Sequence, residues 1–159
     1  MAHGLSIRCS IISIFVTVCL NVTCQTMEIT AVQPLSFGNF TNSGGGSVTI
    51  HHNGTGSTTG TIKLAGVDHQ AAVFNLTITA ERTINIYYPP DQYLTRDGGT
   101  ETMAVTVGPD DKGASFVAAP DPFVNIINIG GTLNVGTPAA NPTGNYSGEI
   151  EVEFTMVYE

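Results

Sequence analysis

Three glutamates near the C-terminus have a spacing at which paired carboxylates could cleave a glycosidic bond. Glu149, Glu151 and Glu153 alternate with apolar residues, which places all three on one face of a β-strand. Glycoside hydrolysis needs two carboxyl groups in contrasting environments, one protonated and one ionised. Since these three share one polar face, we interpret them as a solvated row that discourages unwanted edge pairing.

The histidines and aspartates show no metal-ligand spacing. His51 and His52 are adjacent, so on a strand their side chains point to opposite faces and cannot share one ion. Asp110, Asp111 and Asp121 could contact Ca²⁺ through a loop, but no alternating acidic series ending in Glu occurs. The sequence also lacks a nucleophile elbow, a P-loop and a dinucleotide-binding fingerprint. We therefore expect no enzymatic activity, no metal and no cofactor.

Tyrosines gather around a proline pair in the middle of the chain. Tyr87, Tyr88 and Tyr93 flank Pro89 and Pro90. Exposed tyrosines suit loop contacts with carbohydrate or protein. They could equally cap the core at strand ends, and we favour that second interpretation.

The first 24 residues have the features of a secretory signal peptide. Arg8 precedes an apolar run over residues 9–20, which is too short to span a bilayer. Val22 and Cys24 fit the −3 and −1 positions of a cleavage site before Gln25. Lipidation of Cys24 is the alternative, although a lipidated cysteine normally follows a smaller residue than threonine. Cleavage before Gln25 would leave a secreted chain without cysteine and without a membrane span.

Residues 25–159 suffice for one domain and are too few for two of ordinary size. They carry four cationic side chains against thirteen carboxylates, so the formal net charge is −9. Nucleic-acid binding requires a basic stripe that replaces counterions on phosphate, and this charge balance excludes one. It also disfavours association with anionic lipid.

Alternating apolar and polar residues predict a chain built almost entirely of short strands. The Gly-rich segment 42–46, the Asn53–Gly54 pair and residues 108–113 have the composition of turns and loops. Many short strands at regular spacing are typical of an all-β fold, here an antiparallel immunoglobulin-like β-sandwich over residues 25–159. The expected strands cover residues 27–31, 47–51, 61–65, 72–78, 83–88, 102–107, 123–127, 131–136 and 146–159.

The last expected strand has the clearest pattern in the chain. Its apolar residues share one face, which predicts burial of that face and exposure of the other. Such a strand must pair with earlier segments of the chain or with another molecule. The apolar residues are Ile150, Val152, Phe154, Met156 and Tyr158.

Four glycine-containing segments follow one another in a recognisable order. They are Leu-Ser-Phe-Gly at 35–38, Gly-Gly-Ser-Val-Thr at 45–49, Gly-Gly-Thr-Leu-Asn-Val-Gly at 130–136 and Gly-Asn-Tyr-Ser-Gly at 144–148. With the penultimate Tyr158, this set resembles an uncharacterised family of secreted bacterial domains described as pilin-like and of unknown function. The resemblance covers nearly the whole of residues 25–159.

The C-terminal strand is also similar to that of chaperone–usher pilins, which end in an alternating strand with a penultimate tyrosine. This similarity implies a pilin-like sandwich that lacks one strand, supplied first by a periplasmic chaperone and then by the N-terminal segment of the next subunit. It implies an acceptor groove lined by Ile150, Val152, Phe154, Met156 and Tyr158, and a donor segment with Met27, Ile29 and Ala31 as its knobs. Unlike those pilins, this chain has no disulfide after residue 24 and only a short segment before Pro34.

The resemblance implies a structural subunit of a surface fibre, assembled by donor-strand exchange. Its partners would be identical or related subunits, a periplasmic chaperone and an usher. It would pass through the periplasm to the cell surface or a fimbrium and serve cell adhesion. The alternative is a self-complete exported binding domain, adhesin-like, in which the N-terminal segment completes its own sandwich. Such a domain would recognise glycan or protein through its loops, with Tyr87, Tyr88 and Tyr93 as contact residues.

Overall fold

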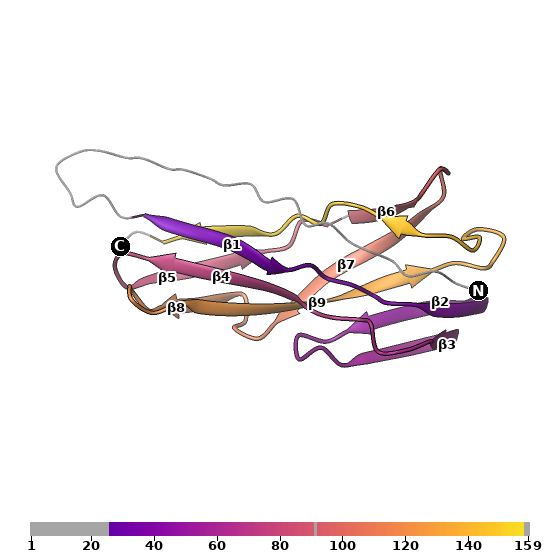
Figure 1. Ribbon diagram of the computed structural model, residues 1–159. Coiled ribbons are helices and arrows are strands. Elements are labelled where there is room, and N and C mark those ends of the chain that lie inside the picture. Colours follow the sequence, from indigo (N-terminus) through magenta and orange to yellow (C-terminus); the bar gives the residue numbers. More distant parts are fainter. Residues whose placement is uncertain (1–25, 91, 158–159) are drawn as a thin grey trace.

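Alternating side chains produce strands throughout the computed structural model, which describes residues 26–90 and 92–157 (Figure 1). Within these ranges the chain forms eleven strands and no helix. The predicted signal peptide over residues 1–24, with Cys24, and the penultimate Tyr158 lie outside the described residues. The strands are β1 (Met27–Gln33), β2 (Phe40–Ile50), β3 (Gly56–Leu64), β4 (Ala72–Ile78), β5 (Arg82–Tyr87), β6 (Gln92–Arg96), β7 (Thr102–Asp110), β8 (Ser115–Ala118), β9 (Asn125–Val135), β10 (Tyr146–Ser147) and β11 (Glu153–Met156).

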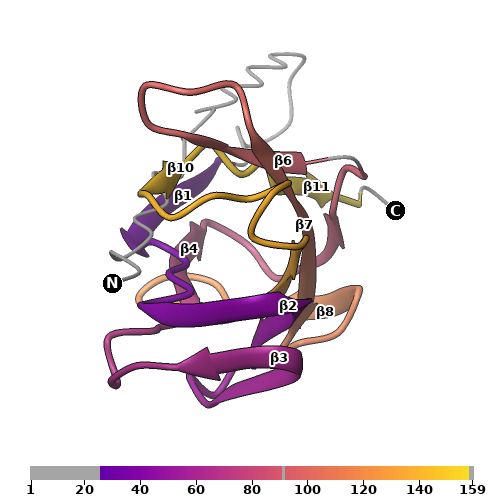
Figure 2. The same ribbon diagram turned by 90° about the vertical axis from the view of Figure 1, so that its right-hand side faces the viewer.

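The strands form two sheets, and within each sheet all paired strands run antiparallel. The large sheet has the order β1-β4-β9-β7-β6-β10, and the hairpin β2–β3 joins it through pairing of β2 with β9. The small sheet has the order β11-β5-β8. Figure 2 shows the hairpin β2–β3 on the opposite side of the molecule from β1 and β10. The predicted all-β antiparallel sandwich is confirmed.

The core fills the space between the sheets with the apolar face of each strand. In β4, Ala72, Phe74, Leu76 and Ile78 are buried, while the residues between them are only partly covered. The small sheet contributes buried side chains such as Ile84 to the same cluster. Burial of each such aliphatic or aromatic side chain stabilises the fold by about 1.5–3 kcal/mol. The core is continuous across both sheets and contains no cysteine.

Several predicted strands are confirmed, and β4 matches its predicted range of 72–78 without change. The Asn53–Gly54 pair lies in the turn of the hairpin β2–β3, where the Gly54 amide donates to the His51 carbonyl at 2.8 Å. Gly54 has a φ of 81°, which a residue without a Cβ adopts at little cost. The predicted turn is therefore present, with Gly54 as its last residue and His52 and Asn53 as its central ones.

The predicted turn over residues 42–46 is wrong, because these residues lie inside β2. The pairing of β2 with β3 shifts register between Asn42 and Gly46, so the glycines form a bulge. Asn42 Oδ1 accepts hydrogen bonds from the amides of Gly44 and Gly45, at 3.2 and 2.8 Å. The bulge satisfies its backbone locally and lets the strand continue.

The C-terminal half differs from prediction in where its strands begin and end. The loop predicted over 108–113 starts later, because β7 continues to Asp110. Two predicted strands merge into β9, which runs unbroken through Gly130 and Gly131. A Cβ on Gly130 would lie 2.4 Å from the Ile50 carbonyl oxygen, so the missing side chain permits close packing against β2. The short strands β6 and β8 were not among the predicted ones.

The close approach at Gly130 gives a stability prediction. Gly130→Ala should lower the free energy of unfolding by about 1–3 kcal/mol, because the methyl group would overpack against backbone that cannot move aside. Gly44→Ala is the matched control, since its Cβ would lie 3.2 Å from the Thr61 hydroxyl, which a side-chain rotation can shift. Urea unfolding followed by circular dichroism measures both. Equal stability of the two variants would contradict the packing explanation.

Candidate strand-exchange site

The N-terminal strand β1 forms one edge of the large sheet and pairs with β4 of the same molecule. Its inward residues Met27, Ile29 and Ala31 lie opposite Ile78, Leu76 and Phe74, respectively. All three are half-buried and pack against the core. The predicted donor residues therefore share one face of one strand and cover the edge of the core.

Both ends of β1 are fixed by polar contacts. At its start, the Thr79 amide donates to the Thr26 carbonyl at 3.3 Å, and the Thr26 amide donates to Thr79 Oγ1 at 3.2 Å. At its end, Gln33 Nε2 donates to the Ala71 carbonyl at 2.7 Å. A register shift between Ala31 and Gln33 marks a bulge just before this contact.

The chain that follows β1 is anchored separately. The amides and carbonyls of Ser36 and Gln70 exchange two hydrogen bonds of 2.9 Å, and Gln70 Nε2 donates to the Pro34 carbonyl at 3.1 Å. Leu35 and Phe37 are fully buried. The boundary between the edge strand and the fixed body of the domain therefore falls between Gln33 and Pro34.

The C-terminal segment forms two strands in place of the continuous one that was predicted. β10 pairs with β6 in the large sheet, whereas β11 pairs with β5 in the small sheet. Residues 148–152 cross from one sheet to the other. A Cβ on Gly148 would lie 2.6 Å from the Tyr93 carbonyl oxygen, so the crossing begins where only glycine fits.

Gln92 holds this crossing segment in place. Its Nε2 donates to the Glu151 carbonyl at 3.0 Å, and its Oε1 accepts from the Glu151 amide at 2.6 Å. Nε2 also donates to the Pro89 carbonyl at 2.8 Å. The side chain is 8% exposed. Gln92 thus satisfies both backbone groups of a residue that has no strand neighbour.

The apolar face predicted for the C-terminal segment is turned toward the core. Ile150 is 3% exposed, and Val152, Phe154 and Met156 are half-buried against the core cluster. The Phe154 ring packs against Phe74 of β4, with centroids 5.5 Å apart and planes at 58°. Through Phe74, which lies beside Ala31 of β1, the predicted donor and acceptor segments contact the same part of the core.

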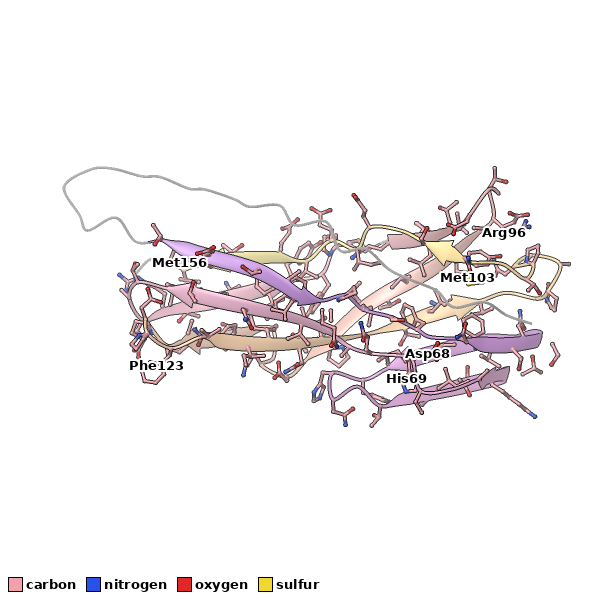
Figure 3. All side chains as sticks on the ribbon, viewed as in Figure 1. Asp68, His69, Arg96, Met103, Phe123 and Met156 are labelled. Carbon is pink, nitrogen blue, oxygen red and sulfur yellow. The ribbon has the colours of Figure 1, made fainter. Side chains whose placement is uncertain are left out.

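The opposite face of this segment is exposed. Glu149, Glu151 and Glu153 all lie on the surface, as the solvated interpretation predicted. Figure 3 places Met156 at the end of the molecule where β1 begins and where Phe123 also lies. The C-terminal strand and the start of β1 therefore share one end of the sandwich.

The three tyrosines differ in their exposure and in the elements that carry them. Tyr87 and Tyr93 are about half exposed but belong to β5 and β6, which lie in different sheets. Tyr88 is partly buried, and its hydroxyl donates to the buried carboxylate of Asp110. Burial raises the pKa of the Tyr88 hydroxyl well above its usual value, and the hydrogen bond to Asp110 raises it further. Tyr88 fits the core-cap interpretation.

An open polar cleft beside the end of β1 was not predicted from the sequence. It has a volume of about 410 Å³ and lies between the hairpin turn at His52–Gly54 and the segment His69–Ala71, with Gln33 and Val73 on its wall. Figure 3 shows His69 next to the hairpin β2–β3. Distant parts of the sequence meet here, so no local pattern marks the cleft. Among residues 26–90 and 92–157, no three His, Cys, Asp or Glu side chains are grouped as metal ligands.

Comparison with known proteins identifies one family. Over residues 27–156 the chain matches the model of a domain of unknown function, DUF4402. No curated protein matches the chain, and no solved structure does. In the described ranges no helix is long and apolar enough to cross a membrane.

The contacts of Gln92 predict a local effect on the C-terminal strand. Gln92→Ala should lower the free energy of unfolding by about 1–3 kcal/mol, because it removes the three hydrogen bonds that the buried Gln92 side chain makes with the backbone of Glu151 and Pro89. Amide hydrogen exchange should rise at Glu151 and across β11 more than in β4. Uniform exchange across both strands would argue against a local role for Gln92.

The raised pKa of Tyr88 predicts loss of stability in alkali. Above the ordinary tyrosine pKa of 10.0, the unfolded chain releases the phenol proton while the folded chain retains it. The stabilisation is therefore complete below pH 10 and declines as the pH rises further. Urea midpoints at pH 8 and pH 11 should differ less for Tyr88→Phe than for the unmodified protein. The pKa of Tyr146 is also raised by burial, so some dependence should remain.

Proposed function

The chain belongs to the DUF4402 family, and from this premise we propose that it is an exported, pilin-like subunit of a surface fibre, joined to the next subunit by exchange of β1. The observation that carries the proposal is the placement of β1. It is an N-terminal edge strand whose inward residues complete the core and whose connection to the domain lies at one point. An identical segment from a second copy could make the same contacts with β4.

The hinge required for exchange lies between Gln33 and Pro34. Proline fixes its own φ and favours an extended conformation in the residue before it. Leu35 is buried directly after it, so the body of the domain keeps its own anchor when β1 leaves. A straightened hinge would carry β1 away without disturbing the pairing of Ser36 with Gln70.

The energetics of exchange follow from the identity of the contacts. The ladder with β4 and the packing of Met27, Ile29 and Ala31 are the same whether β1 comes from its own chain or from a neighbour. The equilibrium between the closed monomer and the exchanged form is then set by the local concentration of β1 strands and by the conformation of the hinge. A chaperone that pairs with β4 while β1 is free would favour exchange. We propose this role for a periplasmic chaperone acting with an usher.

A self-complete binding domain is the second candidate, and one observation favours it. In this structure β1 pairs with β4 of its own chain, so the sandwich is closed without a partner. In that case the exposed Tyr87 and Tyr93 would be the aromatic side chains available for glycan or protein contacts. The two candidates differ in which copy of β1 occupies the edge of β4.

A pair of engineered cysteines separates the two candidates. Thr30 and Asn75 are direct neighbours across the β1–β4 ladder on its outward face. Antiparallel neighbours lie at a Cα separation that a disulfide can bridge. The T30C/N75C variant, refolded at high concentration under reducing conditions and then oxidised, should give a ladder of covalent multimers on a non-reducing gel. Reduction should collapse the ladder to monomer.

The matched control places a disulfide where no exchange is proposed. Ala104 and Asn134 are outward neighbours in β7 and β9, far from the N-terminus in sequence. The A104C/N134C variant should remain monomeric under the same treatment, and the protein without added cysteines should form no ladder. Exclusively monomeric, internally crosslinked T30C/N75C would overturn the exchange proposal and leave the binding domain.

A further inference from the structure

We infer that the polar cleft beside the end of β1 is the contact between neighbouring copies of this chain, where the hinge of the incoming copy crosses the host. The inference rests on the proposed strand exchange and names the part of the host that receives the neighbour. The cleft lies between the turn of the hairpin β2–β3 and the segment His69–Ala71.

The positions of Gln33 and Pro34 fix where the two chains must cross. Gln33 donates to the Ala71 carbonyl, so an incoming β1 would end its pairing at Ala71 of the host. The host's own Pro34 is held by Gln70, the adjacent residue. The incoming chain must therefore turn away from the host within one residue of the host's own hinge.

The space needed at this crossing is present. Gln33, Gln70 and Ala71 all line the cleft, which has a volume of about 410 Å³ and is open to solvent. A few residues of extended chain can displace the water in this open hollow and pair with the amide groups on the wall.

The charge of the lining also suits a second copy. Residues 25–159 have a formal net charge of −9, so two copies repel each other over most of their surface. The side chains that line the cleft are amides, imidazoles and apolar groups, without any carboxylate, lysine or arginine. A lining of this kind opposes the approach of a second acidic copy less than a lining of carboxylates would.

Filling the cleft should block exchange while the domain stays folded. His52 is exposed and lines the cleft from the hairpin turn, so His52→Trp in the T30C/N75C background would occupy the space with a bulky side chain. The adjacent His51 is also exposed but does not line the cleft, which makes His51→Trp the matched control. Non-reducing gels compare the covalent ladders, and thermal unfolding followed by circular dichroism compares the folds.

The expected result is loss of the ladder for His52→Trp, retention for His51→Trp, and equal melting temperatures for the two. An undiminished ladder for His52→Trp would overturn the inference and leave strand exchange intact. Loss of the ladder in both variants would also overturn it, because the effect would belong to the hairpin and not to the cleft. Absence of a ladder in the T30C/N75C parent would overturn the proposed function and this inference with it.

Discussion

The ladder between β1 and β4 covers one flank of the core and leaves β1 itself as the edge strand of the large sheet. Without β1, the outer hydrogen-bonding groups of β4 would be open to any strand that approached, and Phe74, Leu76 and Ile78 would lose the cover of three apolar side chains. No cysteine after residue 24 can reinforce the arrangement. The closure of the core therefore depends on non-covalent pairing, and the proposed exchange would transfer this pairing from one molecule to another.

The glycine-containing segments that carry the family resemblance have a structural explanation. A Cβ on Gly130 would meet the Ile50 carbonyl at 2.4 Å, one on Gly136 would meet Asn141 Oδ1 at 2.9 Å, and one on Gly148 would meet the Tyr93 carbonyl at 2.6 Å. Asn141 is itself buried and joins the Gly136 amide to the Thr102 carbonyl. Each glycine thus permits a close approach between strands or a turn that closes onto them. The glycines of these segments therefore serve the packing of the fold.

The sequence predicted the features that local alternation of apolar and polar residues determines. It did not predict the features that depend on contacts between residues far apart in the chain. The range of β4 was correct to the residue, and the inward faces of β1 and of residues 150–156 were correctly assigned. The C-terminal segment was predicted as one strand because its alternation is unbroken, but Gly148 and the contacts of Gln92 with Glu151 move it from one sheet to the other. Those contacts join residues 59 positions apart, so no local pattern contains them. The cleft was missed for the same reason.

The two outer strands at the shared edge of the core differ in how freely they can leave it. Removal of β11 would pull on Ile150, which is buried, and would break the contacts of Gln92, leaving buried polar groups without partners. Removal of β1 exposes an edge that an identical strand can pair again, and its hinge lies before the anchored Leu35. Under the proposed exchange, the N-terminal strand is therefore the one that would be transferred, and the C-terminal segment would belong to the body that receives it. This asymmetry would give a chain of subunits a single direction, with each N-terminus seated on the body of its neighbour.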